Sequence, residues 1–256
     1  MSQQRADILL VEQGLAESRS QATRLIMAGE VRVGTDHVVQ KANERFPPHT
    51  PLHVEQRHRY VSRGADKLAP ALDRFDLRPD GWIALDVGAS TGGFTDLLLQ
   101  RGAARIYAVD VGYGQLHQRL REDPRVICLE RTNARLLDRS IIPEPVDILT
   151  ADVSFISLRK VLPACAPLLK PAAWVFVLVK PQFEARRHEV GKGGVVRSET
   201  VRQRCTREIC AFAQSQFNWA LQGTIPSPIT GPKGNQETVA VFWNAAPNGP
   251  LHAETH

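Results

Sequence analysis

Residues 83–94 have the sequence IALDVGASTGGF, in which a short apolar run leads into a glycine-rich turn. Glycine at positions 88, 92 and 93 allows the backbone to turn tightly and to approach a ligand just before the first turn of a helix. Glycines also serve simply to close turns, so the loop alone is weak evidence for a ligand. Its place directly after a strand-like run makes it a candidate binding loop.

The rest of residues 65–244 alternates strand-like and helix-like segments around this loop. Apolar runs of strand length lie at 83–85, 106–109, 126–129, 146–149 and 174–179, with two further strands near 219–224 and 238–243. Helical stretches lie at 92–100, 115–121, 158–169 and 199–217. This alternation predicts an α/β fold with a doubly wound, Rossmann-like sheet of seven strands. Residues 245–256 are expected to form a disordered tail.

Residues 1–56 have a different pattern, typical of a small α+β domain. An apolar run at 8–11 followed by Gly14 predicts a short helix that ends at the glycine. Ser18 and Gln21 have the spacing of a capping box and predict the start of a second helix. Valines on either side of a turn at 34–36 predict a hairpin, and a last short strand is expected near 52–54. The polar, basic residues 57–64 are expected to link this domain to the larger one.

Composition narrows the class of protein. No apolar run approaches the roughly 20 residues that span a bilayer, and the first residues lack the apolar core of a signal peptide, so a cytoplasmic protein without a membrane partner is expected. The four cysteines lack paired spacing, so neither a disulfide framework nor a metal site is expected. The net charge is +5 and 25 of the 32 basic residues are arginine, which fits a nucleic-acid partner. The base composition of the genome explains this excess equally well.

Charged residues follow successive strands of the predicted sheet, namely Asp86, Asp110, Asp152 and Lys180. The carboxyl ends of parallel strands meet at one edge of such a sheet, where ligands bind. An acid after the second strand, here Asp110, commonly holds ribose hydroxyls. Asp86 would lie unfavourably beside a pyrophosphate, so a cofactor with cationic groups, such as S-adenosylmethionine, fits better than NAD.

The loop pattern D-x-G-x-S-x-G-G resembles the first motif of the Rossmann-like methyltransferases, which use S-adenosylmethionine. The resemblance implies that the acid and the glycines hold the methionine end of the cofactor, and that Asn133 contacts its adenine. A turn residue is an equally good interpretation of Asn133. The predicted cofactor-binding residues are Asp86, Gly88, Ser90, Gly92, Gly93, Asp110, Asn133 and Asp152.

Lys67, Asp152, Lys180 and Glu237 come from widely separated segments, and their order resembles the K-D-K-E tetrad of the FtsJ-like RNA ribose 2′-O-methyltransferases. A ribose hydroxyl must lose its proton as it attacks a methyl carbon. An amine can accept that proton when desolvation and a neighbouring positive charge bring its pKa down from about 10.4 toward neutrality. The resemblance therefore implies a base at Lys180, a neighbouring charge at Lys67, and two carboxylates that hold the amines.

The alternative to this tetrad is two salt bridges on the surface, and such pairs contribute little to the stability of a protein. Against that alternative, Lys180 ends the most apolar run of the chain, where an unpaired amine would be costly. Other methyltransferase chemistries fit less well. Methylation of amino groups would call for N/D-P-P-Y/F after the fourth strand, where this chain has DVSF. Carbon-five methylation of pyrimidines would call for a cysteine nucleophile near the fourth or fifth strand. Cys165 lies within a helical stretch instead, where it is expected to be a core residue.

Residues 5–33 resemble the RNA-binding domain that is named after ribosomal protein S4. In that family the second helix and the turn after it face structured RNA, which implies contacts to phosphates. The predicted RNA-binding residues are Arg5, Arg19, Ser20, Arg24 and Arg32, with Arg63 from the linker. A small helical cap with solvated arginines is the alternative.

An S4-like domain followed by an FtsJ-like domain resembles the TlyA family over residues 5–243. The stretches that carry this resemblance lie at 60–64, 67–68, 85–94, 108–116, 152–158, 180–184 and 234–237. It implies 2′-O-methylation of cytidine in 16S or 23S ribosomal RNA, or in both, with ribosomal RNA or subunits as the partner, and it brings the label of haemolysin. A non-catalytic ribosome-assembly factor and a membrane-active haemolysin are the alternative functions, and the oligomeric state stays open.

The sequence allows more than one structure at two places, the helix around Lys67 and the GKGG segment. Pro70 follows Lys67 by three residues, and proline is tolerated only in the first turn of a helix, so the helix is expected to start near Lys67 or to kink. The sequence GKGG at 191–194 resembles a mobile loop of the family and lacks the spacing of a phosphate-binding P-loop. A lid over the cofactor or RNA and plain flexibility both fit it.

Overall fold

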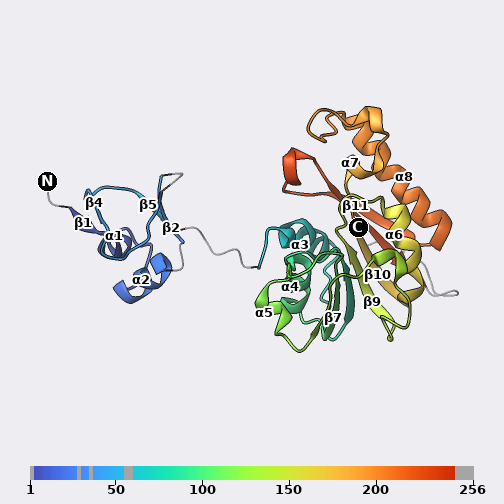
Figure 1. Ribbon diagram of the computed structural model, residues 1–256, viewed down its shortest axis with the longest axis horizontal. Helices are drawn as coiled ribbons and strands as arrows, with labels where there is room; N and C mark the ends of the chain where they lie inside the picture. The colour runs from blue at the N-terminus through green and yellow to red at the C-terminus, as the bar shows by residue number, and fades with distance from the viewer. Residues whose placement is uncertain (1–2, 28–29, 35–36, 55–59, 246–256) are drawn as a thin grey trace. The chain divides into compact units, whose positions relative to one another are not determined.

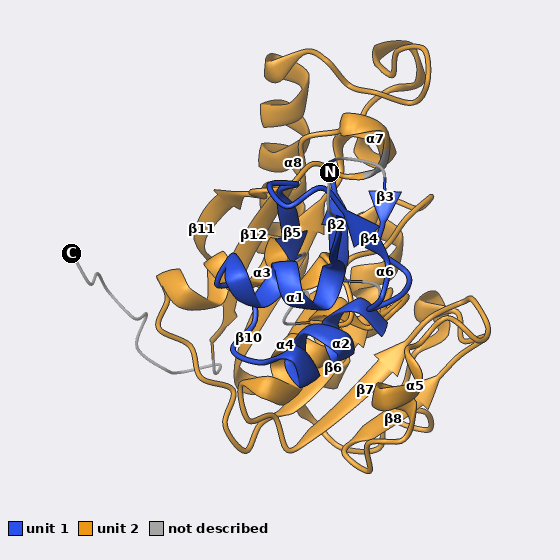
Figure 2. Ribbon diagram, turned by 90° about the vertical axis from the view of Figure 1, so that its left-hand side faces the viewer, with its two compact units in different colours: residues 1–59 blue, residues 60–256 orange. Residues whose placement is uncertain are grey.

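The computed structural model describes residues 3–27, 30–34, 37–54 and 60–245. It divides the chain into two units, residues 1–59 and 60–256 (Figures 1 and 2). The first unit has a core of its own, and the second has two cores, one on each face of its sheet. The predicted tail lies outside the described residues except for Ala245.

The first unit packs two helices against short strands. The helices are α1 (Ala6–Glu12) and α2 (Arg19–Met27), and the strands are β1 (Gln4–Arg5), β2 (Val31–Val33), β3 (His37–Val38), β4 (Arg45–Phe46) and β5 (Leu52–Val54). Strands β3, β2 and β5 form an antiparallel sheet, and β1 pairs with β4. Leu9, Leu10 and Ile26 from the helices share a buried cluster with Val31 and Leu52. The predicted α+β organisation is confirmed.

The second unit contains a sheet of seven strands in the order β11-β12-β10-β9-β6-β7-β8. The strands are β6 (Ile83–Val87), β7 (Arg105–Val109), β8 (Val126–Leu129), β9 (Val146–Ala151), β10 (Leu169–Val179), β11 (Ala220–Pro226) and β12 (Thr238–Asn244). Strands β6 to β10 are parallel, whereas β12 lies antiparallel between β10 and β11. The predicted Rossmann-like α/β fold is confirmed.

Helices cover both faces of this sheet, as the alternating pattern of the sequence requires. One apolar core contains side chains of α6 (Leu158–Cys165) and α8 (Glu199–Phe217). The other contains side chains of α3 (Gly64–Arg74), α4 (Gly93–Gln100) and α5 (Gln118–Arg121). The buried Cys165 belongs to the first core, as expected, and desolvation raises the pKa of its thiol to about 12.

Two predicted helices are shorter in the structure than in the sequence pattern. The helix predicted at 158–169 ends at Cys165 and continues as a 3-10 turn, η2 (Ala166–Leu168). Pro167 lies in that turn, and it lacks the amide hydrogen that a continued α-helix would need there. The helix predicted at 115–121 begins only at Gln118, where the His117 ring accepts a hydrogen bond from the Arg119 amide. The α7 helix (Pro181–Glu184) directly follows β10.

The described part of the predicted linker packs with the second unit. Tyr60 is buried, and the Val61 amide donates a hydrogen bond to the Asp96 carboxylate at 2.8 Å. Helix α3 already begins at Gly64. The boundary of the larger unit therefore precedes Tyr60, whereas residues 55–59 of the expected linker lie outside the described residues.

Pro70 lies inside α3, six residues after its first residue. The helix starts at Gly64, three residues before Lys67, so Pro70 lies beyond its first turn. A proline at this position cannot donate to the carbonyl of Asp66, one turn earlier. The chain accepts this loss within a short helix whose side chains Leu68, Ala71 and Leu72 are fully buried.

Candidate active site

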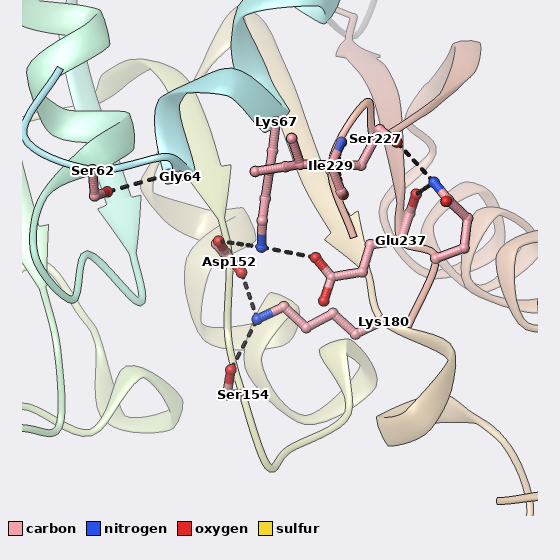
Figure 3. Close-up of polar contacts among 10 residues, drawn as sticks. Ser62, Gly64, Lys67, Asp152, Ser154, Lys180, Ser227, Ile229 and Glu237 are labelled. Carbon is pink, nitrogen blue, oxygen red and sulfur yellow. Dashed lines mark hydrogen bonds and ion pairs between the residues drawn. The ribbon is translucent and has the colours of Figure 1, made fainter. Parts of the chain in front are cut away.

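The structure brings the four predicted catalytic residues together from four different segments (Figure 3). Lys67 is on α3, Asp152 follows β9, Lys180 follows β10, and Glu237 immediately precedes β12. Lys180 Nζ lies 2.5 Å from Asp152 Oδ1, and Lys67 Nζ lies 3.5 Å from Asp152 Oδ2. Lys67 Nζ also donates to Glu237 Oε2 at 2.8 Å. Asp152 therefore stands between two amines.

Burial makes this cluster different from a surface ion-pair network. The side chains of Lys67 and Lys180 are 10% and 7% exposed, and that of Glu237 is fully buried. Among the residues that the structure describes, only Lys67 pairs with the Glu237 carboxylate, and Glu237 Oε1 has no hydrogen-bond partner. Two amines and two carboxylates balance in formal charge, which permits burial of all four groups.

Sequence reasoning missed Ser154, which also contacts Lys180. Lys180 Nζ donates to Ser154 Oγ at 2.8 Å (Figure 3). Ser154 is exposed and belongs to the wall of the cavity described below. The motif Asp152-Val153-Ser154 offered the only sequence signal, because it places a hydroxyl two residues after the tetrad carboxylate.

The loop between β11 and β12 fixes the position of Glu237. The Ser227 amide donates to the Glu237 carbonyl, and the Gln236 amide group donates to the Ser227 carbonyl at 2.7 Å. A Cβ atom on Gly231 would lie 2.2 Å from Glu237 Oε1, so glycine is required there for space. The buried Asn235 joins this loop to the GKGG segment, because its Nδ2 donates to the Gly194 carbonyl and its Oδ1 accepts from the Val196 amide.

A cavity of about 890 Å³ lies at the carboxyl ends of the parallel strands. Its volume lies within the range of small-molecule sites, about 300–1,000 Å³. The predicted site residues in its wall are Gly88, Ser90, Asp110, Asn133 and Asp152. Asp152 is thus shared between the cavity and the tetrad, so a molecule in the cavity lies next to the two lysines.

Asp110 and Asn133 are both at the cavity, and each also holds the local backbone. The Asp110 carboxylate accepts from the amides of Ser90 and Gly112 at 2.8 and 2.7 Å. Asn133 Oδ1 accepts from the Arg135 amide and caps η1 (Ala134–Leu136). The turn interpretation of Asn133 is therefore compatible with a place in the cavity wall.

The three glycines of the predicted binding loop do different things. Gly88 has φ +84°, and a Cβ atom there would lie 2.6 Å from the Asp152 carbonyl oxygen at the cavity wall. Gly92 and Gly93 are buried away from the cavity wall. A Cβ on Gly92 would meet the Leu120 side chain at 2.2 Å, and one on Gly93 would meet Ser62 Oγ at 2.5 Å. Both glycines therefore leave room for neighbouring side chains and backbone, and their part in cofactor binding stays a prediction.

Asp86 does not line this cavity, and its role at the methionine end of a cofactor stays a prediction. It is fully buried, and its carboxylate accepts from the hydroxyls of Thr95 at 2.6 Å and Thr150 at 2.9 Å. Desolvation raises the pKa of Asp86 to about 6, and the negative charge of Asp152 acts in the same direction against the two hydroxyls. Asp86 ties β6 to α4 and β9 beneath the loop.

The raised pKa of Asp86 predicts a pH-dependent effect of Asp86→Asn on stability. In the unfolded chain an aspartate titrates near 3.9, so the folded state loses stability as pH rises from about 4 through about 6. The asparagine variant lacks this loss. Between pH 4 and pH 8 its free energy of unfolding should therefore gain about 2–3 kcal/mol relative to the unchanged protein. Urea unfolding of both proteins at the two pH values measures the change, and a constant difference would contradict it.

Two exposed aromatic side chains were not predicted, and one of them, Phe155, lines the cavity. Phe155 is 91% exposed, has φ +64°, and packs against Phe183 with the ring centroids 5.3 Å apart. Tyr113 is 69% exposed, and the Arg131 guanidinium covers one face of its ring at 4.1 Å. Exposed rings beside positive charge suit the stacking of unpaired bases.

The predicted RNA-binding residues of the first unit include an ion-pair cluster. Asp7, 2% exposed, accepts hydrogen bonds from both Arg5 and Arg19. The hydrogen bonds from Arg5 and then Arg19 outweigh burial and lower the pKa of Asp7. Ser20 and Arg24 are exposed on α2, and Arg32 is partly exposed on β2. Arg63 is exposed but belongs to the second unit, at the start of α3.

Two further features bear on the function classes. In the described ranges, no cluster of three or more His, Cys, Asp or Glu side chains has an arrangement that could hold a metal ion. Within the same ranges, no helix combines the length and the apolar character that a membrane span requires.

Comparison with known proteins gives consistent matches over both units. The FtsJ-like methyltransferase model matches residues 60–243, and the S4 domain model matches residues 4–45. The 16S/23S rRNA (cytidine-2′-O)-methyltransferase TlyA of Mycobacterium tuberculosis is 48% identical over 235 residues, which are 91% of this chain and 87% of the relative.

Two other relatives bear the name of a haemolysin. Hemolysin A of Brachyspira hyodysenteriae is 38% identical over 245 residues, 93% of this chain and 99% of the relative. A solved structure from Streptococcus thermophilus, also named a hemolysin, is 41% identical with a TM-score of 0.72, covering 96% of this chain and 90% of that one. The shared sequence therefore spans proteins with two different names.

Proposed function

This chain belongs to the TlyA branch of the FtsJ-like methyltransferases, and from that premise we propose that it methylates the 2′-hydroxyl of cytidine in ribosomal RNA with S-adenosylmethionine. The observation that carries the proposal is the buried tetrad, in which Lys180 and Lys67 share the Asp152 carboxylate at the cavity. The substrate class comes from the relative in Mycobacterium tuberculosis, whose name specifies cytidine in 16S and 23S rRNA.

We assign the role of proton acceptor to Lys180. The amine must be neutral when the ribose hydroxyl arrives, and it takes the proton as the oxygen attacks the methyl carbon. Asp152 and Ser154 hold this amine through the contacts at 2.5 and 2.8 Å. Lys67, held in turn by Glu237, orients the far side of Asp152. Fixed orientation matters because methyl transfer needs the acceptor oxygen in line with the bond that breaks.

The cavity fits S-adenosylmethionine in size and in the chemistry of its wall. Asp110 offers a carboxylate for ribose hydroxyls, and Val111 and Val153 offer apolar surface beside Asn133 for an adenine ring. Gly88 and Ser90 belong to the wall beside Asp152, where we assign the methionine end. The bound cofactor supplies a methyl group activated by its sulfonium. Gly92, Gly93 and Asp86 support this wall from behind.

The RNA side of the proposal rests on both units. We assign residues 1–56 to RNA binding through phosphate contacts of the exposed side chains Arg19, Ser20 and Arg24. In residues 65–244, which we assign to the methyltransferase domain, Phe155 offers a stacking surface at the cavity, and the exposed Tyr113 ring offers a second one. A ribosomal subunit in the cytoplasm is the corresponding partner, since it presents structured RNA to both units.

The proposal is tested with purified 30S and 50S subunits and protein-free rRNA incubated with tritiated S-adenosylmethionine. We expect label in at least one RNA, and mapping of 2′-O-methyl groups should locate it at a cytidine ribose. Binding to subunits without incorporated label in any preparation would contradict an enzyme and favour the ribosome-assembly factor. Label on a base rather than a ribose would contradict the assigned chemistry.

A further inference from the structure

We propose that Ser154 is a positioning residue for the reaction, because its hydroxyl fixes the direction in which the Lys180 amine accepts a proton. The inference rests on the proposed function, since it concerns the same amine. It adds a fifth residue to the Lys-Asp-Lys-Glu cluster. Ser154 lines the cavity and accepts a hydrogen bond from Lys180 Nζ at 2.8 Å (Figure 3).

The geometry of an amine explains why a second partner matters. A neutral amine has two N–H bonds and one lone pair in a tetrahedral arrangement, and only the lone pair can take a proton. Without a directional hydrogen bond the amine turns about the Cε–Nζ bond, because an ion pair alone does not select which way the N–H bonds point. Lys180 Nζ donates one N–H to Ser154 Oγ at 2.8 Å, whereas Asp152 Oδ1 holds the amine only as an ion pair at 2.5 Å. The hydroxyl is therefore the directional partner, and its hydrogen bond restricts the directions that the lone pair can take.

The backbone holds Ser154 and Lys180 at a fixed separation. Ser154 lies in the loop after β9, and Lys180 immediately precedes α7. The same two segments meet again where the Phe155 ring packs on Phe183. They meet a third time where Glu184 accepts from Ser157 Oγ at 2.6 Å and from the Leu158 amide at 2.8 Å.

Because of these additional contacts, the conformation of the loop does not depend on the Ser154 hydroxyl. The Phe155–Phe183 packing and both Glu184 hydrogen bonds use other atoms, so they remain when Ser154 becomes alanine. Lys180 also keeps Asp152 as an ion-pair partner in that variant. Removal of the hydroxyl therefore frees the rotation of one amine and leaves the loop in place.

The test compares Ser154→Ala and Ser154→Thr with Ser198→Ala. Ser198 caps α8 far along the chain, through its contact with the Val201 amide, and serves as a structural serine control. Steady-state methyl transfer at varied RNA and saturating S-adenosylmethionine gives kcat and the RNA KM. For Ser154→Ala we expect kcat to fall about tenfold, while the cofactor Kd and the RNA KM change less than about twofold. Ser154→Thr, which keeps a hydroxyl, should retain at least about half of the activity, as should Ser198→Ala.

A second measurement does not depend on turnover. Solvent exchange of the Lys180 Nζ protons, followed by 15N NMR, should be several-fold faster in Ser154→Ala than in Ser154→Thr and the unchanged protein. Equal exchange in all three would overturn the inference, and so would an alanine variant within twofold of the unchanged kcat or one that loses cofactor affinity. If the unchanged protein transfers no methyl group, the proposed function fails, and the exchange rates still decide whether Ser154 holds the amine.

Discussion

Replacing Lys180 with methionine is expected to lower kcat for methyl transfer by about a thousandfold, the middle of the range for loss of a general base. Methionine keeps most of the volume of the buried side chain and removes the amine. Asp152 retains Lys67 as a partner at 3.5 Å, so the carboxylate is not left without a positive charge. Affinity for S-adenosylmethionine should therefore remain within a few-fold of the original.

Lys170→Met is the matched control for this experiment. Lys170 lies at the other end of β10, where its amine pairs with Asp147 at 2.7 Å and is partly exposed. The Lys170→Met substitution removes a lysine–aspartate ion pair of similar length at the start of β10, whereas Lys180 follows the end of that strand. Because the start of β10 lies away from the cavity, kcat should stay within about twofold. Rate measurements with saturating cofactor and isothermal titration separate chemistry from binding. A Lys180→Met protein with more than a tenth of the original kcat would refute the assigned base.

Replacing Lys67 with methionine is expected to destabilise the protein by about 3–5 kcal/mol, because it leaves the buried Glu237 carboxylate without its positive partner. Glu237 is fully buried, and the 2.8 Å contact with Lys67 Nζ is its ion pair. The effect greatly exceeds the value of an exposed pair, at most about 1 kcal/mol. Lys170→Met again provides that comparison. Urea unfolding monitored by tryptophan fluorescence measures both.

The double variant Lys67→Met, Glu237→Gln distinguishes charge from packing. It removes both charges, so at least half of the lost stability should return even though the lysine is still absent. If the double variant is as unstable as Lys67→Met alone, the loss comes from packing of the helix α3 side chain. Methyl transfer should remain impaired in the double variant, because Asp152 loses the group that orients its far oxygen.

The order of strands and helices could be predicted because buried parallel strands have long apolar runs and their connections are helical. The same logic predicts that Asp152 and Lys180 meet at one edge of the sheet, because each directly follows a parallel strand. The contact between Lys180 and Ser154 could not be predicted, because it depends on the loop conformation around Phe155, which has φ +64°. Periodicity contains no information about such a turn.

The roles of the loop residues were harder to predict than their positions. Gly92 and Gly93 fit a ligand-binding loop by their spacing. The absence of a side chain at these positions makes room for Leu120 and Ser62, which are remote in sequence and could not be foreseen. The carboxylate of Asp86 meets Thr150, 64 residues away, so its burial among hydroxyls is a tertiary property. By contrast, Asp7 lies two residues after Arg5, and that local acid–base spacing could have indicated the pair.

The position of β12 determines how much of the chain must be synthesised before the protein can transfer a methyl group. Glu237 and β12 come late in the chain, yet that strand occupies an interior place between β10 and β11. A nascent chain that has emerged only as far as Thr224 contains Lys67, Asp152 and Lys180 without the acid that pairs with Lys67. Truncation before residue 237 should thus yield an inactive product, and a nascent chain cannot transfer a methyl group before Glu237 has left the ribosome.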